Sequence, residues 1–239
     1  MDPLTTAAAS GMRSRMEALD MLANNIANTS VPGFKMDREL YDLYRASEAS
    51  EDTTNQPLLQ KNWTDFSQGI LGATGSPLNL ALEGAGFFVA SSPSGSLYTR
   101  KGTLKVSTTG ELVTPEGYPL QGQDGKPIIA DPLLPIDIDP DGAVRQGGEE
   151  VGRLAVVSFK DPGALAKRGS TYFSSQASVV PESSNALVRQ GQLEGANGEP
   201  AENAVRLVSV MRQFESLKKA LSVGLEMNRR AIEDVAKVS

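Results

Sequence analysis

Residues 9–35 read ASGMRSRMEALDMLANNIANTSVPGFK, and this stretch sets the organisation of the chain. Its apolar residues recur at spacings of three and four, the heptad-like spacing of one helix face; they are Ala9, Met12, Met16, Leu19, Ala23 and Ile26. Pro3 suits the first turn of such a helix, and Pro32 with Gly33 ends it. The pattern predicts a helix over residues 3–28, roughly 39 Å long.

A second helical segment is predicted over residues 200–238, near the other end of the chain. Pro200 fits its first turn. One row of side chains again repeats at helical spacing; it contains Leu207, Met211, Phe214, Leu217 or Leu221, Leu225, Asn228, Ile232 and Val235. A continuous helix here would be about 55 Å long.

The residues between the two helices, from 66 to 190, are typical of β-structure. Turn signals follow one another closely, for example at Pro93-Ser94-Gly95, Thr109-Gly110 and Asp141-Gly142. Short alternating or apolar runs separate them, such as residues 103–107 and 154–159. Residues 35–65 are mixed, with a short helix expected over 39–46 and a polar loop after it.

These patterns predict an α+β protein with long N- and C-terminal helices that form a coiled-coil-like domain and a central β-rich domain. The expected division is 1–34 for the first helix, 35–65 for a connecting segment, 66–195 for the β-rich domain and 196–239 for the last helix. Two amphipathic helices of unequal length leave apolar surface uncovered when they pack only on each other, which favours contact with neighbouring copies.

Composition excludes several classes of function. The chain has no cysteine and no histidine, which excludes disulfides, thiolate metal sites and Ser-His-Asp or Cys-His catalysis. The net charge is −6, which argues against nucleic-acid binding. No apolar run approaches the roughly 20 residues of a membrane span, and residues 1–10 do not form a secretory signal. We therefore expect cytoplasmic residence or export without a cleaved signal.

Three local patterns are partly similar to ligand sites, and each is more typical of a turn or of close backbone packing. The Asp-rich run at 137–142 resembles the start of a calcium loop, yet its twelfth position would be Gly148 instead of Glu. The pair Gly84 and Gly86 lacks the third glycine of a dinucleotide loop. Glu149 and Glu150 are adjacent, as in a solvated turn. We expect no enzyme activity, catalytic residue, cofactor, metal or small-molecule substrate.

Three sequence motifs resemble those of the flagellar rod and hook proteins. The first is Ala-Asn-Asn-Ile-Ala-Asn at 23–28 with Gly-Phe-Lys at 33–35; the second spans Leu82–Val89, Tyr98–Gly102 and residues 110–120; the third is residues 190–197 with Arg-Gln-Phe-Glu at 212–215. Together they cover nearly the whole chain in the family's order. The motif residues expected to matter are Asn24, Asn25, Asn28, Gly33, Phe34, Gly84, Gly86, Arg100, Gly102, Leu193, Glu194 and Asn197. Gly198, Glu199 and Ala204 depart from the family pattern, at a local cap and at one packing contact.

The resemblance implies a structural subunit of the bacterial flagellar basal-body rod in the periplasm. It implies partners among self and neighbouring axial subunits, and export by the flagellar type III apparatus. The terminal helices would polymerise into a torque-transmitting shaft, with contacts at Leu4, Ala8, Met12, Leu19, Leu22 and Ile26 and at Leu207, Met211, Phe214, Leu221, Leu225 and Ile232.

Two alternatives remain open from sequence. Within the family, length and the run at 74–82 favour the proximal rod proteins, with distal rod or hook-type axial subunits as the alternative. From another class, a soluble β-domain on a helical hairpin could bind a partner protein or glycan. That binding module predicts a monomer with protected terminal helices, whereas a rod subunit predicts helices that are mobile until neighbours cover them.

Overall fold

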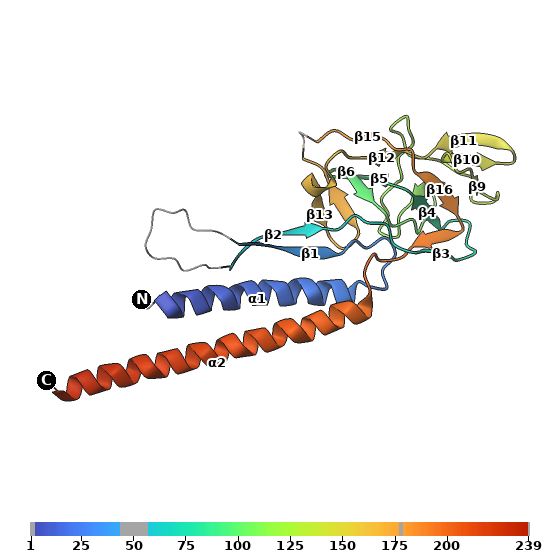
Figure 1. Ribbon diagram of the computed structural model, residues 1–239. Coiled ribbons are helices and arrows are strands. Elements are labelled where there is room, and N and C mark those ends of the chain that lie inside the picture. Colours follow the sequence, from blue (N-terminus) through green and yellow to red (C-terminus); the bar gives the residue numbers. More distant parts are fainter. Residues whose placement is uncertain (1–2, 44–56, 177–178, 239) are drawn as a thin grey trace. The chain divides into compact units, whose positions relative to one another are not determined.

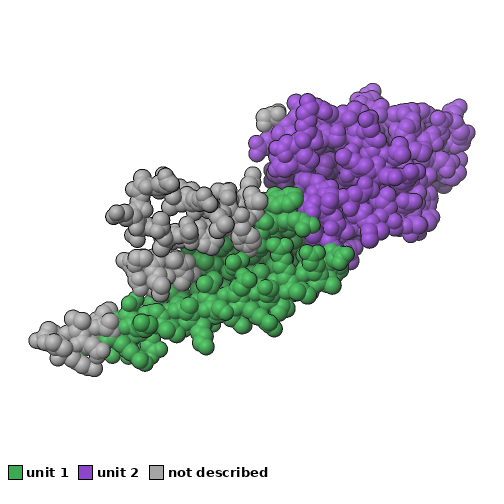
Figure 2. Space-filling model, in the orientation of Figure 1, with its two compact units in different colours: residues 1–27, 37–63, 199–239 green, residues 28–36, 64–198 purple. Residues whose placement is uncertain are grey.

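The computed structural model describes residues 3–43, 57–176 and 179–238. Side chains of residues 3–8, 40–43, 57–61, 231–232 and 234–238 lie outside that description. The chain divides into two compact units, coloured separately in Figure 2. Unit 1 comprises residues 1–27, 37–63 and 199–239, and unit 2 comprises residues 28–36 and 64–198. The division made from sequence, with both terminal helices in one assembly domain, stays a prediction.

Unit 1 contains the two terminal helices. Helix α1 covers Pro3–Ala27 and helix α2 covers Pro200–Val238, close to the predicted bounds. The helices lie side by side and run in opposite directions (Figure 1). Their shared core is short: Ala18, Met21 and Leu22 of α1 are buried with Val210 of α2, and Leu19 and Leu207 pack partly against them. Neither helix of the described chain is long and apolar enough to cross a membrane.

A two-stranded sheet completes unit 1. Strand β1 (Asp37–Leu43) pairs with β2 (Pro57–Thr64). The short helix expected over residues 39–46 is therefore wrong as far as residue 43, and residues 44–46 lie outside the described part. The run Arg38–Leu43 has no period-two alternation of its own, so pairing with β2 overrides its helical preference.

The predicted α+β class with a coiled-coil-like domain is wrong. Strands contribute 34% of the residues and helices 27%, which makes the protein mainly β with two terminal helices. The described chain contains no α-helix besides α1 and α2. The heptad row is not a continuous buried seam either, because Met211 and Leu225 are 46% and 54% exposed. Strands extend into the segment after α1, which the sequence analysis treated as a connection.

Unit 2 consists of antiparallel strand pairs around one larger sheet. That sheet has six strands in the order β13-β14-β6-β5-β12-β15. Their bounds are Ala166–Arg168, Tyr172–Ser174, Gly95–Thr99, Phe87–Ser92, Val156–Ser158 and Glu182–Ser183. A short 3-10 helix, η1 (Pro162–Ala164), precedes β13. The β5–β6 hairpin turns through Pro93 and Ser94 into Gly95, whose φ of 119° is a glycine conformation.

Smaller sheets surround the six-stranded one. They are β11-β10-β9 (Glu149–Arg153, Ala143–Gln146, Asp137–Ile138), β16-β4 (Leu187–Gln190, Leu80–Glu83), β17-β3 (Gln192–Glu194, Leu71–Ala73) and β7-β8 (Lys105–Val106, Leu112–Val113). The pairs β16-β4 and β17-β3 bring residues near 190 beside residues near 80, and so join the second sequence motif to the third.

Strand β5 separates two hydrophobic cores, which explains the unbroken apolar run at its start. Phe88 and Ala90 point into a large aliphatic core that contains Leu80, Leu82 and Leu112. The alternate residues of β5 enter an aromatic core on the other face, where Phe87 meets Phe173 and Phe159 edge to face at ring-centroid distances of 5.9 Å. A strand buried on both faces needs no polar alternation.

Candidate functional site

Unit 2 contains a buried cluster of charged side chains, which we call the clasp: Lys35, Arg100 and Glu194. The Lys35 Nζ donates to Glu194 Oε1 over 2.6 Å, and Arg100 Nη1 donates to Glu194 Oε2 over 3.1 Å. The Glu194 Oε1 also accepts the Gly69 amide over 2.9 Å, and Lys35 donates to the Ser67 carbonyl. All three charged side chains are at most 4% exposed. One residue from each sequence motif therefore meets at a single point.

Burial dominates the electrostatics of the clasp. Removal from water lowers the pKa of Lys35, and the adjacent Glu194 carboxylate offsets part of that lowering. Burial likewise lowers the pKa of Arg100, again opposed by Glu194. The Arg100 Nε has no hydrogen-bond partner among the described residues, although its guanidinium lies 5.6 Å from the Phe87 ring centre. One carboxylate thus compensates two desolvated cations, and each depends on it.

Backbone groups of the motif glycines complete the clasp. Arg100 Nη2 donates to the Gly84 carbonyl over 2.7 Å, and the Gly33 amide donates to the Glu194 carbonyl over 2.7 Å. Gly33 has φ of 71°, and a Cβ there would lie 2.4 Å from the Lys101 nitrogen. A Cβ on Gly102 would lie 1.8 Å from the Leu80 carbonyl oxygen. These glycines allow close backbone approach, as a side chain would not.

Asparagine amides fix the chain where it enters and leaves unit 2. The Asn197 Oδ1 accepts the Met36 amide over 2.9 Å, and its Nδ2 donates to the Asp65 carbonyl. Within unit 1, Asn25 is buried and exchanges two hydrogen bonds with the Asp37 backbone, at 2.8 and 3.1 Å. These bonds satisfy backbone groups at the start of β1 and directly before β1 and after β2.

The remaining motif residues have varied positions. Phe34 is fully buried, and Lys167 Nζ lies 4.5 Å from its ring centre. Leu193 is half-buried in β17, and a Cβ on Gly86 would meet Ser184 Oγ at 2.6 Å. Asn24 is exposed and Asn28 half-buried, each engaged in interactions of its own. The family departure at Gly198 has a visible reason: a Cβ there would lie 1.8 Å from the Met36 sulfur.

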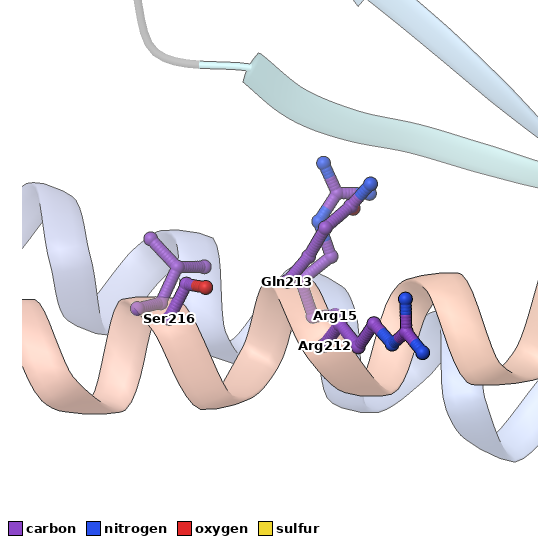
Figure 3. A pocket seen from close by; sticks show the side chains of 5 residues that line it. Arg15, Arg212, Gln213 and Ser216 are labelled. Carbon is purple, nitrogen blue, oxygen red and sulfur yellow. The ribbon is translucent and has the colours of Figure 1, made fainter.

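The helix pair of unit 1 presents a hollowed, partly apolar surface. One hollow of about 380 Å³ is lined by Arg15 of α1 and by α2 residues, among them Arg212, Gln213 and Ser216 (Figure 3). Nearby, the Glu39 side chain of β1 is buried, with Arg206 Nη2 3.5 Å from its Oε2. This ion pair lacks hydrogen-bond geometry, since neither Glu39 oxygen has a hydrogen-bond partner among the described residues.

The residues predicted to form subunit contacts fall into three groups. Leu22 is buried, and Leu19 and Leu207 pack against the helix-pair core of the same copy. Met12, Ile26, Phe214 and Leu221 are half-buried, whereas Met211 and Leu225 are exposed. The side chains of Leu4, Ala8 and Ile232 lie outside the described part. Their role between subunits stays a prediction.

Sequence reasoning missed several residues that hold these sites together. Lys35 stood in the first motif but was not singled out, and Ala18, Met21 and Val210 lie outside the chosen rows. A lysine directly after a buried Gly-Phe pair could have signalled an internal ion pair, because Lys is almost never fully buried unless paired. Val210 precedes Met211 by one residue, so a shift of one position in the row would have found it.

The chain resembles flagellar proteins along most of its length. The family described as flagella basal body rod protein matches residues 6–35, and the flagellar hook protein FlgE/F/G D1 domain matches residues 81–146. The flagellar basal-body rod protein FlgF of Caulobacter vibrioides is 33% identical over 227 residues, covering 92% of this chain and 93% of that protein. The chain belongs to the family of flagellar basal-body rod proteins.

Other relatives agree with this assignment. FlgF of Mesorhizobium japonicum is 29% identical, covering 83% of both chains. The rod protein FlgG of Buchnera aphidicola subsp. Schizaphis graminum is 28% identical, covering 91% of this chain and 94% of that protein. This rod protein is a structural subunit of the flagellar basal-body rod, and the resemblance drawn from the three motifs is confirmed. Because the chain belongs to this family, the alternative of a separate binding module no longer applies. Its proximal or distal position in the rod stays a prediction.

Proposed function

We propose that copies of this rod subunit join axially through the outer surfaces of α1 and α2, and that it acts by geometry without catalysis. The observation that carries the proposal is the apolar surface that α2 exposes. Val205, Val208, Met211, Val223, Leu225 and Met227 are between 46% and 73% exposed. Exposed apolar side chains in this number on one helix mark an interaction surface.

The pairing of the helices explains why the apolar residues toward the end of α2 are uncovered. Gly11 of α1 lies opposite Leu217 of α2, and a Cβ on Gly11 would be 3.5 Å from its side chain. Helix α2 has 39 residues against 25 in α1, so its last third extends past the start of α1. Leu225 lies level with the start of α1, and Met227 lies beyond it. The helix of another subunit would cover them and complete the packing that one copy lacks.

Partners of this surface would be other rod subunits, self or related, because relatives are named as rod proteins. A contact between unlike faces of identical subunits builds a helical shaft when its rotation does not close into a ring. We propose further that the chain reaches the rod by the flagellar export apparatus. The absence of cysteine leaves no disulfide to hinder passage of an unfolded chain.

The substitution Leu225→Asp tests the proposal. It places a charge on an exposed site, so we expect unchanged far-UV circular dichroism of the dilute monomer. Burying that charge against a neighbour would be unfavourable by several kcal/mol, so we expect loss of rod assembly and motility in cells. Ser222→Asp is the matched control, one turn away on exposed surface, and should retain motility. Full motility of Leu225→Asp would contradict the proposal.

Hydrogen exchange provides a second, independent test. In dilute monomer, amides of α1 and α2 should exchange fast while unit 2 is protected, since the helices share only a short core. In assembled rods, the same helices should become protected. Strong protection of both helices in the monomer would argue against assembly-dependent ordering.

A further inference from the structure

The chain passes between its two units four times, and hydrogen bonds hold it at these crossings. The crossings follow residues 27, 36, 63 and 198. Two units joined by free linkers normally move relative to one another. The residues at these crossings are instead bonded or packed, each inside its own unit, so they lack the freedom of an ordinary linker.

The crossing between Met36 and Asp37 is held on both sides. The Met36 amide donates to Asn197 Oδ1 over 2.9 Å, and the Met36 carbonyl accepts the Asp65 amide over 2.8 Å. The Asp37 amide donates to Asn25 Oδ1 over 3.1 Å, and the Asp37 carbonyl accepts Asn25 Nδ2 over 2.8 Å. Both backbone polar groups of each residue therefore have a partner, and rotation at this crossing would break hydrogen bonds.

Asn197 gathers three of the four crossings inside unit 2. In addition to its bond with Met36, its Nδ2 donates to the Asp65 carbonyl over 2.6 Å and to Ser67 Oγ over 3.1 Å. Asn197, Met36 and Asp65 each lie within two residues of a crossing. Gly198 adds a direct contact, because the Met36 side chain occupies the space that a Cβ at position 198 would need.

Asn25 holds the remaining crossing inside unit 1. It lies two residues before the end of α1, and its bonds to Asp37 join the end of that helix to the start of β1. Asn25 is 1% exposed, so water competes little for its amide. The two asparagines therefore link all four crossings through the consecutive residues Met36 and Asp37.

We propose that Asn25 and Asn197 are positioning residues that make the two units of one subunit move together, so that a displacement of the terminal helices is passed on to unit 2. The inference goes beyond the joining of copies through α1 and α2, because it concerns a single subunit. Loss of either amide would leave backbone groups at a crossing to water and would restore rotation there.

Spin labels on the purified monomer test this inference. The chain has no cysteine, so two introduced cysteines are the only sites of attachment. Ala204→Cys in α2 and Ser94→Cys in the β5–β6 turn place one label in each unit, and both positions are exposed. Double electron–electron resonance then measures the distribution of distances between the labels. We expect a narrow distribution in the otherwise unchanged chain and a severalfold wider one after Asn197→Ala or Asn25→Ala.

Gln190→Ala is the matched control. The Gln190 amide also makes three hydrogen bonds inside unit 2: it donates to the carbonyls of Pro77 and Ile136, over 3.0 and 2.7 Å, and accepts the Ile138 amide over 3.1 Å. None of these residues lies at a crossing. Its loss should destabilise unit 2 by a similar mechanism and leave the distribution between the units unchanged.

A second pair of labels, at Ser94→Cys and Lys105→Cys, lies wholly inside unit 2 and should keep its distribution in every variant. Widening of this inner pair in Asn197→Ala would mean that the amide only stabilises unit 2, which would overturn its positioning role. A broad distribution between the units of the unchanged chain, no widening in either asparagine variant, or equal widening in Gln190→Ala would also overturn the inference. The measurement uses the monomer, so its result is independent of the assembly tested by Leu225→Asp.

Discussion

Removal of the Glu194 charge should destabilise unit 2 far more than loss of an ordinary ion pair. In Glu194→Gln, two cations lose their shared counter-ion while their side chains stay at most 4% exposed. Breaking a buried pair by changing one partner costs about 3–5 kcal/mol, because a desolvated charge is left uncompensated. Here two are left, so we expect a loss in the free energy of unfolding at the upper end of that range.

The pH dependence provides a second signature. The pKa of Lys35 is lower in the folded chain than in the unfolded chain, so the unfolded chain binds more protons between the two values. Stability therefore rises with pH inside that window, which ends near the ordinary lysine pKa of about 10.4. Glu194 raises the pKa of Lys35, and its neutralisation should lower that pKa further. The window then opens at lower pH in Glu194→Gln than in the unchanged protein.

The assay is urea unfolding of the full chain, followed by near-UV circular dichroism because the aromatic core lies in unit 2. The matched control is Glu83→Gln, which removes the partner of Arg189 in a half-exposed pair with 2.6 Å between Nε and Oε2. Exposed pairs contribute about 0–1 kcal/mol. A loss in Glu194→Gln no larger than in Glu83→Gln, with parallel pH profiles, would refute the reasoning.

Three further substitutions test separate features of the fold. Gly102→Ala sets a Cβ 1.8 Å from the Leu80 carbonyl oxygen, so it should destabilise unit 2 by about 1–3 kcal/mol or more. Urea unfolding measures this loss, and an unchanged unfolding midpoint would contradict the close approach. Phe173→Ala empties part of the aromatic core, and calorimetry should show a loss of about 3–5 kcal/mol. Asn25→Ala removes both hydrogen bonds to the Asp37 backbone and should cost about 1–3 kcal/mol, seen as earlier loss of helical circular dichroism on heating.

The helices could be predicted from sequence because their period and end signals are local. Pro3 and Pro200 mark the first turns, and the bounds of α1 and α2 agree closely with the prediction. Strand β1 shows the limit of this approach. Its residues do not decide between helix and strand by themselves. Pairing with β2, which begins about 20 residues later in the chain, makes the segment a strand.

The clasp could be predicted only as three separate motifs. Nothing local in Lys35, Arg100 or Glu194 says that they touch, because the pairing of β17 with β3 and of β16 with β4 brings them together. The exposure of Met211 and Leu225 likewise could not be predicted from the sequence. A heptad row states which residues share a helix face, but the direction in which that face points and the length of the partner helix decide how many of them are covered.

The clasp also sets an order for the maturation of the chain. Lys35 and its carboxylate partner are 159 positions apart, so their contact cannot form until four-fifths of the polypeptide is available. A chain that emerges from its N-terminus holds Lys35 and Arg100 early and receives Glu194 late. Contacts so distant in sequence make folding slow, and native closure of unit 2 must therefore wait for the segment that leads directly into α2. The protein thus completes its β unit only after the residues that directly precede α2 have become available.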